Sequence, residues 1–229
     1  EVYFVDNPRY SIPLINENPL TALEFPIRIG FYEVGEKKFI VSRSQDYFIK
    51  RYGLNNSAAL RSIGTLTETF LKQSSKSRFT QVSPIDSLDT NGIITVESSK
   101  SYGETVSSLQ NTIESNEGLQ LFESKDLSKE AEEIGAELNP IHLFVFGNPK
   151  VGTQLMQQNP NFSIDLPMEV LVEVTDDEKV LIHFQDVAFT AKLHSEKFEN
   201  GLPDTITENL EKMISKALSD DQPQDDSTN

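Results

Sequence analysis

The chain carries one residue pattern twice, at a fixed offset that aligns Asn7 with Asn148. Residues 4–52 align without a gap with residues 145–193. Identical pairs include Asn7 and Asn148, Pro8 and Pro149, Leu14 and Leu155, Asn18 and Asn159, Pro19 and Pro160, Pro26 and Pro167, and Lys38 and Lys179. A long internal period constrains the architecture before any local pattern does, because each copy is expected to form the same supersecondary unit. The sequence therefore predicts a tandem repeat.

Composition divides the chain into two units and a linker. Residues 72–91 are rich in Ser, Thr and Asp and show no sustained hydrophobic period, which is typical of a linker. This segment separates a first unit, residues 1–71, from a second unit, residues 92–218. The tail, residues 219–229, is acidic and polar without an apolar anchor, so we expect it to be disordered.

The second unit predicts an α+β fold. Its hydrophobic periods alternate between strand and helix in the order strand, helix, strand, helix, strand, helix, hairpin, helix. Ser101 and Glu104 have the spacing of a capping box, and Val106, Leu109 and Ile113 follow on one helical face. This β-α-β-α-β-α-β-β-α order favours a mainly antiparallel sheet that is covered by helices.

The same periods predict which side chains of the second unit face inward. A pattern of this kind places every second residue of a strand, and every third or fourth residue of a helix, on the buried side. The expected core residues are Val106, Leu109, Ile113, Leu121, Leu143, Val145, Val170, Val172, Leu181 and Leu210.

The first unit has only the back half of this pattern. Nothing in residues 1–71 corresponds to residues 93–141, so two strands and two helices are missing. A sheet without those neighbours exposes unpaired backbone groups and invites pairing with another chain. We therefore expect a shortened N-terminus, or a protein partner or second copy that completes the first sheet. Residue 1 is Glu and no signal peptide is visible, which indicates a processed, trimmed or partial chain.

One motif string resembles a known family. The string is Phe146-Gly147-Asn148-Pro149-Lys150, then Gly152-Thr153-x-Leu155-Met156, then Asp165-Leu166-Pro167-x-x-Val170-Leu171-Val172. It is similar to the bacterial and archaeal family called domain of unknown function 302, in full over residues 93–194 and as a back half over residues 1–52. The resemblance implies a compact α+β fold of the TATA-binding-protein-like shape, with no implication of DNA binding or of an established activity. Many members carry an Asp-His pair after the second strand, where this chain has Asp126 and Leu127 and so lacks the imidazole.

Charge and composition exclude several function classes. The chain has 20 basic and 36 acidic side chains, a formal charge of −16, which argues against nucleic acid and against an anionic membrane surface. It has no cysteine, so disulfides and thiolate chemistry are excluded. No apolar run is long enough to span a bilayer. This composition suits a bacterial envelope or periplasmic protein, and also a trimmed cytoplasmic one.

The turn at Asn148, Pro149 and Lys150 is the best candidate for a binding site. Asn is a good N-cap and Pro favours the first helical position, so the favoured interpretation is plain helix capping. The free N–H groups of a helix start and the charge of Lys150 would also suit a phosphate or carboxylate. Both interpretations remain open. With the equivalent turn of the first copy, the candidate ligand-binding residues are Asn148, Lys150, Gly152, Thr153, Asn7 and Arg9.

The histidines and the acidic residues give weaker signals. His142 and His183 lie in predicted strands that could be neighbours, but single, partly buried histidines, including His194, are the favoured interpretation. An acidic cluster could bind a cation, yet it lacks the spacing of a calcium loop, and a solvated helix face is the simpler explanation. That cluster is Glu123, Asp126, Glu130, Glu132, Glu133 and Glu137.

Sequence motifs for catalysis are absent: there is no Gly-x-Ser-x-Gly, phosphate-binding loop or dinucleotide fingerprint. We therefore predict no catalytic residue, metal or cofactor. The leading hypothesis is a non-enzymatic module for binding or assembly. The alternative is a small-molecule or anion-binding domain, which could be an enzyme, with its pocket at the Asn148-Pro149-Lys150 turn.

Overall fold

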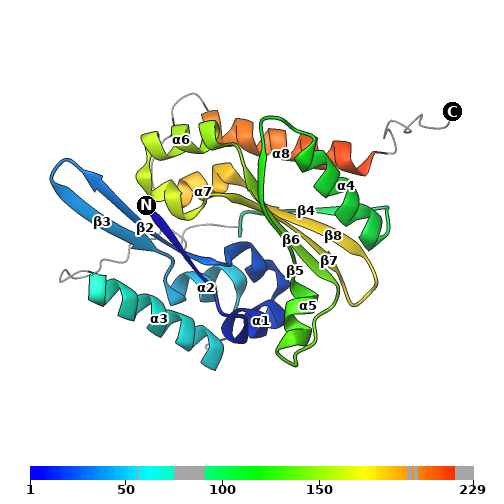
Figure 1. Ribbon diagram of the computed structural model, residues 1–229, viewed down its shortest axis with the longest axis horizontal. Coiled ribbons are helices and arrows are strands. Elements are labelled where there is room, and N and C mark those ends of the chain that lie inside the picture. The colour runs from blue at the N-terminus through cyan, green and yellow to red at the C-terminus, as the bar shows by residue number, and fades with distance from the viewer. Residues whose placement is uncertain (56, 75–90, 195–197, 199–200, 220–229) are drawn as a thin grey trace.

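Two antiparallel sheets with helices packed on them make up the protein (Figure 1). The computed structural model describes residues 1–55, 57–74, 91–194, 198 and 201–219. This arrangement confirms the predicted α+β class. Within the described residues, no helix is both long enough and apolar enough to cross a membrane.

The larger sheet has five strands in the order β4-β8-β7-β6-β5, and all neighbouring pairs are antiparallel. The strands are β4 (Ile93–Ser98), β5 (Gln120–Asp126), β6 (Ile141–Gly147), β7 (Met168–Val174) and β8 (Val180–Gln185). In β6 and β7 nearly every side chain is buried, not only every second one. Because alternate side chains point to opposite faces, both faces of this sheet must be covered.

Two long helices cover the outer face of the larger sheet. They are α4 (Tyr102–Glu114) and α8 (Leu202–Leu218), which pack against each other along the upper right of Figure 1. Leu109 and Ile113 of α4 are fully buried and share one core cluster with Phe144 of β6. The helical period of α4 is therefore confirmed. Ser101 and Glu104 form the predicted capping box at its start.

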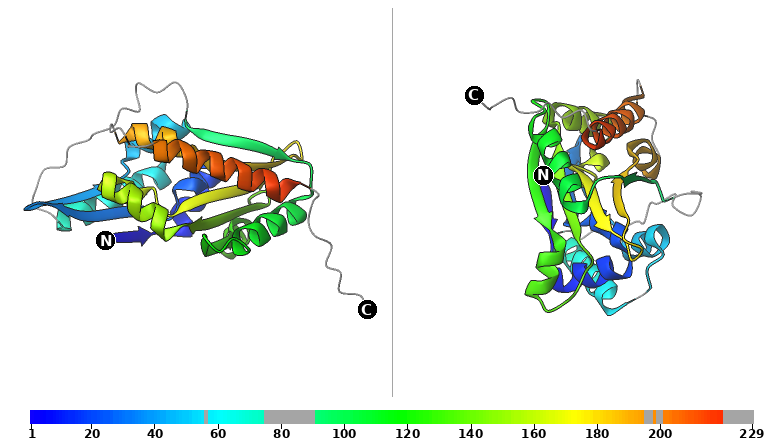
Figure 2. Two further views of the ribbon diagram at one scale, coloured as in Figure 1. Left: turned by 90° about the horizontal axis from the view of Figure 1, so that it is seen from above. Right: turned by 90° about the vertical axis from the view of Figure 1, so that its right-hand side faces the viewer.

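The smaller sheet has three strands in the order β1-β2-β3. They are β1 (Val2–Val5), β2 (Ile27–Val34) and β3 (Lys37–Ser42), again antiparallel. Two helices pack beside this sheet, α1 (Pro8–Glu17) and α3 (Ala58–Ser74). The β2–β3 hairpin projects from the body of the molecule at one end (Figures 1 and 2).

Short helices connect these elements. They are η1 (Pro19–Glu24), α2 (Gln45–Tyr52), α5 (Leu127–Glu133), α6 (Pro149–Gln158), η3 (Pro160–Ile164) and α7 (Val187–Leu193). The helix α3 ends at Ser74, inside the segment 72–91 expected as a linker. Residues 75–90 of that segment, and residues 220–229 of the expected disordered tail, lie outside the described residues.

Equivalent elements recur at the offset of the sequence pattern. Helix α1 starts at Pro8 and α6 at its equivalent Pro149, and the order β1-β2-β3 matches the order β6-β7-β8. The register of the first strand pair also matches, since Val2 lies opposite Gly30 and Leu143 lies opposite Leu171. Cis peptide bonds precede both Pro26 and Pro167.

The two hairpins differ by one residue in register. The first turn is tight, with Val34 opposite Lys37 and with Gly35 in the left-handed conformation that such turns favour. The second hairpin has a longer loop, because Val174 pairs with Val180. Beyond the turn, each residue of β8 therefore pairs with a residue of β7 that lies one position later than the gapless alignment with β3 and β2 would place it.

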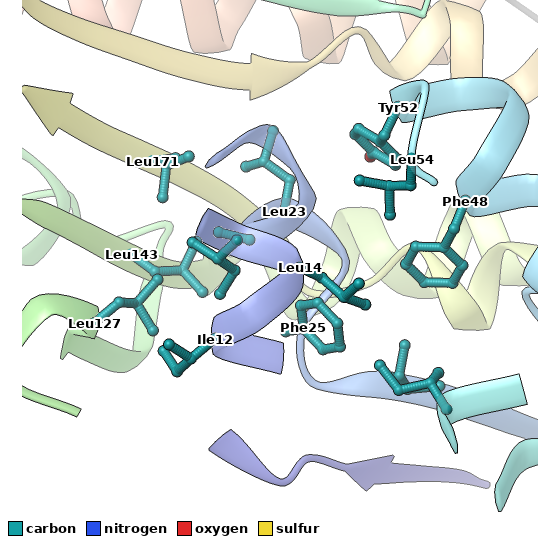
Figure 3. Close-up of a cluster of buried hydrophobic side chains, with 14 of the residues drawn as sticks. Ile12, Leu14, Leu23, Phe25, Phe48, Tyr52, Leu54, Leu127, Leu143 and Leu171 are labelled. Atoms are coloured by element: carbon teal, nitrogen blue, oxygen red, sulfur yellow. The ribbon is translucent and has the colours of Figure 1, made fainter. Parts of the chain in front are cut away.

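The inner face of the larger sheet packs against the first unit (Figure 3). Leu143 and Leu171 of the sheet and Leu127 of α5 belong to the same buried cluster as Ile12 of α1 and Leu23 of η1. The helices α1 and α5 are in contact. One continuous core thus joins the two units.

The predicted core of the second unit needs one correction. Leu143 and Val145 are buried, but in the core shared with the first unit, whereas Val170 and Val172 belong to the outer core. The predicted core residues therefore belong to two clusters, because the sheet of the second unit is covered on both faces. Of the other expected core residues, Leu109, Ile113 and Leu210 are buried, and Val106, Leu121 and Leu181 are only half-buried.

Candidate functional site

Both Asn-Pro turns cap helices, as predicted. The side-chain oxygen of Asn148 accepts hydrogen bonds from the backbone N–H of Lys150 (3.0 Å) and of Val151 (3.3 Å). The side-chain oxygen of Asn7 accepts one from the backbone N–H of Arg9 (3.1 Å). These bonds occupy N–H groups that an anion would need.

The other residues of the candidate site do not converge on a common point. Lys150 and Thr153 are exposed, and the Thr153 hydroxyl donates to the Pro149 carbonyl oxygen within the helix (2.8 Å). Gly152 is half-buried and lies within the same helix. The two turns belong to separate places, since α1 lies at the bottom and α6 at the top of Figure 1. The six candidate residues therefore do not form one site.

An apolar pocket lies beside Asn7, on the helix side of the three-stranded sheet. Its volume is about 140 Å³, and it opens between β1, β2, α1 and α3. The apolar lining comes from Val5, Ile27, Ile29, Ile63, Leu66 and Phe70. Polar groups at its margin include Asp6, Asn7 and Thr67. A largely apolar pocket with a few polar groups is the usual form of a binding site.

The second unit has a helix where the first unit has this pocket. In the alignment of the two copies, Tyr3 and Val5 correspond to Phe144 and Phe146. The exposed fractions are 45% for Tyr3 and 40% for Val5, but 0% for both phenylalanines. The helix α4 packs on β6 and β7 and covers them. In the first unit α3 lies on this face: its Phe70 packs against Tyr3 of β1 and Phe31 of β2, with 6.1 Å between ring centroids in both pairs, and leaves Tyr3 and Val5 only partly covered.

A polar joint between the units is the main feature that sequence reasoning missed. Asp165, after η3, forms an ion pair with Arg43 of the first unit and accepts a contact from His194 Nε2 (2.5 Å). Burial alone would raise the pKa of Asp165, but the Arg43 guanidinium and His194 outweigh it and hold the pKa at about 2. The same carboxylate keeps the pKa of Arg43 above its ordinary value despite burial. The joint is thus charged over the normal pH range.

Glu24 occupies the position in the first unit that Asp165 occupies in the second. Its carboxylate oxygen Oε1 accepts hydrogen bonds from Arg51 (2.9 Å), Tyr47 (2.8 Å) and Tyr52 (2.6 Å). Burial raises the pKa of both tyrosines, which keeps their hydroxyls protonated as donors. Arg51 also donates to Gln185 of β8 (3.1 Å), so this cluster too reaches across the joint.

Another ion pair crosses the joint, between residues that are equivalent in the repeat. Arg28 of β2 pairs with Glu169 of β7, and the two residues align with each other in the repeat. Both side chains are buried, and burial lowers the pKa of Arg28. The alignment of a basic residue with an acidic one was a sequence signal for an ion pair between the two units. The local hydrophobic pattern could not identify this ion pair, because within its own strand each residue looks like a charged side chain exposed to solvent.

The histidines do not form the pair considered from sequence. The strand β7 lies between β6 and β8, so His142 and His183 are not on neighbouring strands. His183 contacts Thr95 (2.9 Å) and Glu173 (3.0 Å), and His142 contacts Ser124 Oγ (2.8 Å). Burial lowers the pKa of His142, although the nearby carboxylate of Asp126 opposes the shift. In the part of the chain that the structure describes, no three His, Asp or Glu side chains cluster as a metal site would require.

Comparison with known families now decides what kind of chain this is. The model of a family described as "Domain of unknown function DUF302" matches residues 94–219, which is more than half of the 229 residues. The chain belongs to the DUF302 family. The resemblance carried by the motif string from Phe146 to Val172 is thereby confirmed. The match covers β4 to α8, so the first unit of this DUF302 chain lies outside it.

Several proteins resemble the DUF302 chain over part of its length. A "Fluoride-specific ion channel FluC 1" of Brucella suis is 36% identical over 112 residues, which is 49% of this chain and 44% of that relative. The protein of the same name from Brucella abortus has the same identity, over 41% of its length. The chain thus spans less than half of the curated relatives it matches. A solved structure, an uncharacterized conserved DUF302 protein from Bacillus stearothermophilus, aligns with 56% of this chain and 95% of its own, at 18% identity and a TM-score of 0.46.

Proposed function

We propose that this DUF302 chain is a non-enzymatic binding module built as a tandem repeat. Its units are residues 1–71 and 92–218, joined by residues 72–91, and the first unit is incomplete. The module binds a polypeptide that completes the first sheet. The observation that carries this proposal is the unequal cover of two equivalent sheet faces, which leaves the apolar pocket beside β1.

Two sheet edges that have no neighbouring strand among the described residues support a polypeptide rather than a single small ligand. The second sheet has β5 beside β6 and β4 beside β8, whereas β1 and β3 are edge strands of their own sheet. The outer face of the second sheet has α4, whereas the first sheet has the pocket. Edge strands and an adjacent apolar face are the two features that chains use for strand addition and helix docking.

The alternative function is a small apolar ligand in the same pocket. A volume of about 140 Å³ is close to the roughly 150 Å³ of a cavity that binds benzene, so the ligand would be about the size of a single ring. This alternative retains Asn7 from the candidate residues, since its side chain lines the pocket. In this alternative the ligand binds in the pocket beside β1, and not at the Asn148-Pro149-Lys150 turn.

A neutral dye tests whether the pocket is an open apolar surface. Nile red suits this chain because an anionic dye would be repelled by the net charge of −16. We expect saturable dye fluorescence with the wild-type chain and a loss of at least half of it in the double variant Val5→Thr/Leu66→Gln. The matched control changes exposed apolar residues outside the pocket, Phe122→Gln/Met156→Gln, and should retain the signal. Equal fluorescence of both double variants would contradict the proposed site.

A further inference from the structure

We propose that the pocket beside β1 binds a single uncharged aromatic ring, with the polar group attached to that ring held at the mouth of the pocket. This inference rests on the proposed function, because it names the chemistry of what enters the same site. Two sources carry this chemistry: a phenylalanine side chain of a bound polypeptide, and a free benzyl compound. Peptide and non-peptide probes distinguish the two sources.

The volume of the pocket limits its occupant to about one ring. About 140 Å³ is close to the roughly 150 Å³ of a cavity that binds benzene. The helix α3 lies across the same face of the sheet, and its Phe70 packs against Tyr3 and Phe31. The space between α3 and the sheet therefore fits one side chain or one small ring, and not a further helix.

The floor of the pocket favours a ring that is apolar and aromatic. Ile27, Ile29 and Ile63 line it and are buried, and the rings of Phe25 and Phe70 line it as well. An apolar ring that binds against these side chains is removed from water. Contacts between its edge or face and the two phenylalanine rings add a further favourable interaction, which an aliphatic group would lack.

The charges beside the pocket exclude an anionic ring. Among the described residues that line the pocket, Asp6 is the only charged one, and none is basic. A carboxylate that enters an apolar site loses hydration, and here no basic lining side chain would compensate for that loss. The Asp6 carboxylate would also repel it. Because Asp6 already pairs with Lys125 (3.5 Å), it offers little to a cationic amine either. The ring is therefore uncharged.

The mouth of the pocket offers hydrogen-bonding groups to the polar end of the ligand. Asp6 and Asn7 line the pocket and are exposed, which places them at its opening. The side-chain oxygen of Asn7 accepts from the backbone N–H of Arg9 (3.1 Å), so its Nδ2 group is the donor that faces a ligand. Thr67 of α3 adds a hydroxyl to the lining. A hydroxyl or a peptide group beside the ring can bond to these groups while the ring lies on the apolar floor.

Two small probes test the site in the full chain. Benzyl alcohol carries the ring with one hydroxyl, and N-acetyl-L-phenylalaninamide carries the same ring on a peptide group. Each probe is titrated while the ¹³C-labelled δ1 methyl groups of isoleucine are observed by NMR. We expect saturable shifts at Ile29 and Ile63, which line the pocket, and none at Ile182 and Ile214 of the outer core. Benzoate should bind at least tenfold more weakly than benzyl alcohol, and N-acetylglycinamide, which has no ring, should give no saturable shift.

A matched pair of variants locates the binding. The double variant Val5→Thr/Leu66→Gln makes two walls of the pocket polar, and its fold should persist because both side chains are at least 40% exposed. It should weaken binding of benzyl alcohol at least threefold. The control Phe122→Gln/Met156→Gln changes exposed apolar residues outside the pocket and should leave the affinity unchanged.

The outcomes separate this inference from the proposed function. Saturable shifts at Ile29 and Ile63 that the double variant weakens support the ring site. Within that result, an amide probe that binds at least as tightly as benzyl alcohol assigns the ring to a polypeptide, and a weaker amide probe assigns it to a free compound. Equal affinity of both double variants, or of benzoate and benzyl alcohol, overturns the inference.

Nile red provides the remaining distinction. Dye binding that depends on Val5 and Leu66, without binding of either ring probe, overturns the single-ring inference and leaves the proposed function in place. Failure of the dye and of both ring probes contradicts the proposed function as well.

Discussion

The same strand pattern is buried in one half of the molecule and open in the other. Phe144 and Phe146 of β6 lie beneath α4, while Tyr3 and Val5 at the equivalent positions of β1 reach solvent. The strand order and the first strand register are alike in the two halves. The difference therefore comes from the covering layer and not from the strands. An apolar side chain can be exposed because its cover is absent, even where its strand is well formed.

The opposite faces of the two sheets are both covered. There the halves cover each other, since η3 packs on β2 and η1 packs on β7. The ion pair between Arg28 and Glu169 joins equivalent positions across this joint. The first unit is thus packed on the side that faces its neighbour, while Tyr3, Val5 and Leu66 remain partly exposed on its helix side. Substitutions in the joint and substitutions in the helices that cover the sheets should therefore change the free energy of unfolding by different amounts.

Breaking the polar joint should have the largest effect. Asp165→Ala leaves the buried Arg43 guanidinium without its carboxylate, and we expect a loss of about 3–5 kcal/mol in the free energy of unfolding. Urea denaturation measures this loss. The control Asp177→Ala removes an exposed acid that pairs with Lys179 and accepts a hydrogen bond from the Thr175 hydroxyl, so it should cost less than about 1 kcal/mol. Similar costs for the two variants would mean that the joint is not a stabilising contact.

Truncating one leucine in each covering helix sharpens the comparison of the two faces. Leu109→Ala in α4 empties a fully buried position and should cost about 2–5 kcal/mol. Leu66→Ala in α3 removes a half-exposed side chain and should cost less than about 1 kcal/mol. Both are measured by urea denaturation. If Leu66→Ala were as costly as Leu109→Ala, the helix side of the first sheet could not be open.

The joint should also give the protein an acid dependence. Because the folded pKa of Asp165 is about 2, below its ordinary value of 3.8, its stabilisation is complete above about pH 4 and is lost as the pH falls toward 2. The expected loss is about 2 kcal/mol, from roughly 1.4 kcal/mol per pKa unit. Urea titrations at pH 5 and at pH 2 should show the gap between wild type and Asp165→Asn shrinking by that amount. A constant gap would indicate an unshifted carboxyl group.

The smallest expected effect concerns the helix caps. Asn148→Ala and Asn7→Ala each remove a side-chain acceptor at a helix start and should each cost about 1 kcal/mol. Similar costs are expected because both asparagines cap in the same way. Thermal or urea unfolding provides the values. A loss of several kcal/mol at one turn alone would reveal a role there besides capping.

The fold class and most elements could be predicted from the sequence because they depend on local periodicity. The helix α4 followed from the spacing of Val106, Leu109 and Ile113 and from the capping box at Ser101. The pattern that aligns Asn7 with Asn148 predicted matching strand orders, and the order β1-β2-β3 does match the order β6-β7-β8. These signals are contained within single segments, or within two segments that align.

The docking of the two units could not be predicted in the same way. The strand period predicted that Leu143 and Val145 are buried, but a period does not indicate which element covers them. In the structure, residues of the first unit cover both side chains. The ion pair of Asp165 and Arg43 joins residues from non-equivalent positions, so no spacing rule indicated it. The pocket beside Asn7 could not be predicted either, because its lining comes from β1, β2, α1 and α3, which are separate in the sequence.

Tryptophan quenching at two equivalent positions tests the central comparison most directly. The chain contains no tryptophan, so Val5→Trp and Phe146→Trp each introduce a single reporter at the same place in the two units. With acrylamide as quencher, we expect the quenching constant of Val5→Trp to be several times that of Phe146→Trp in the folded chain and equal to it in urea. Equal shielding of both tryptophans in the folded chain would contradict an open first sheet.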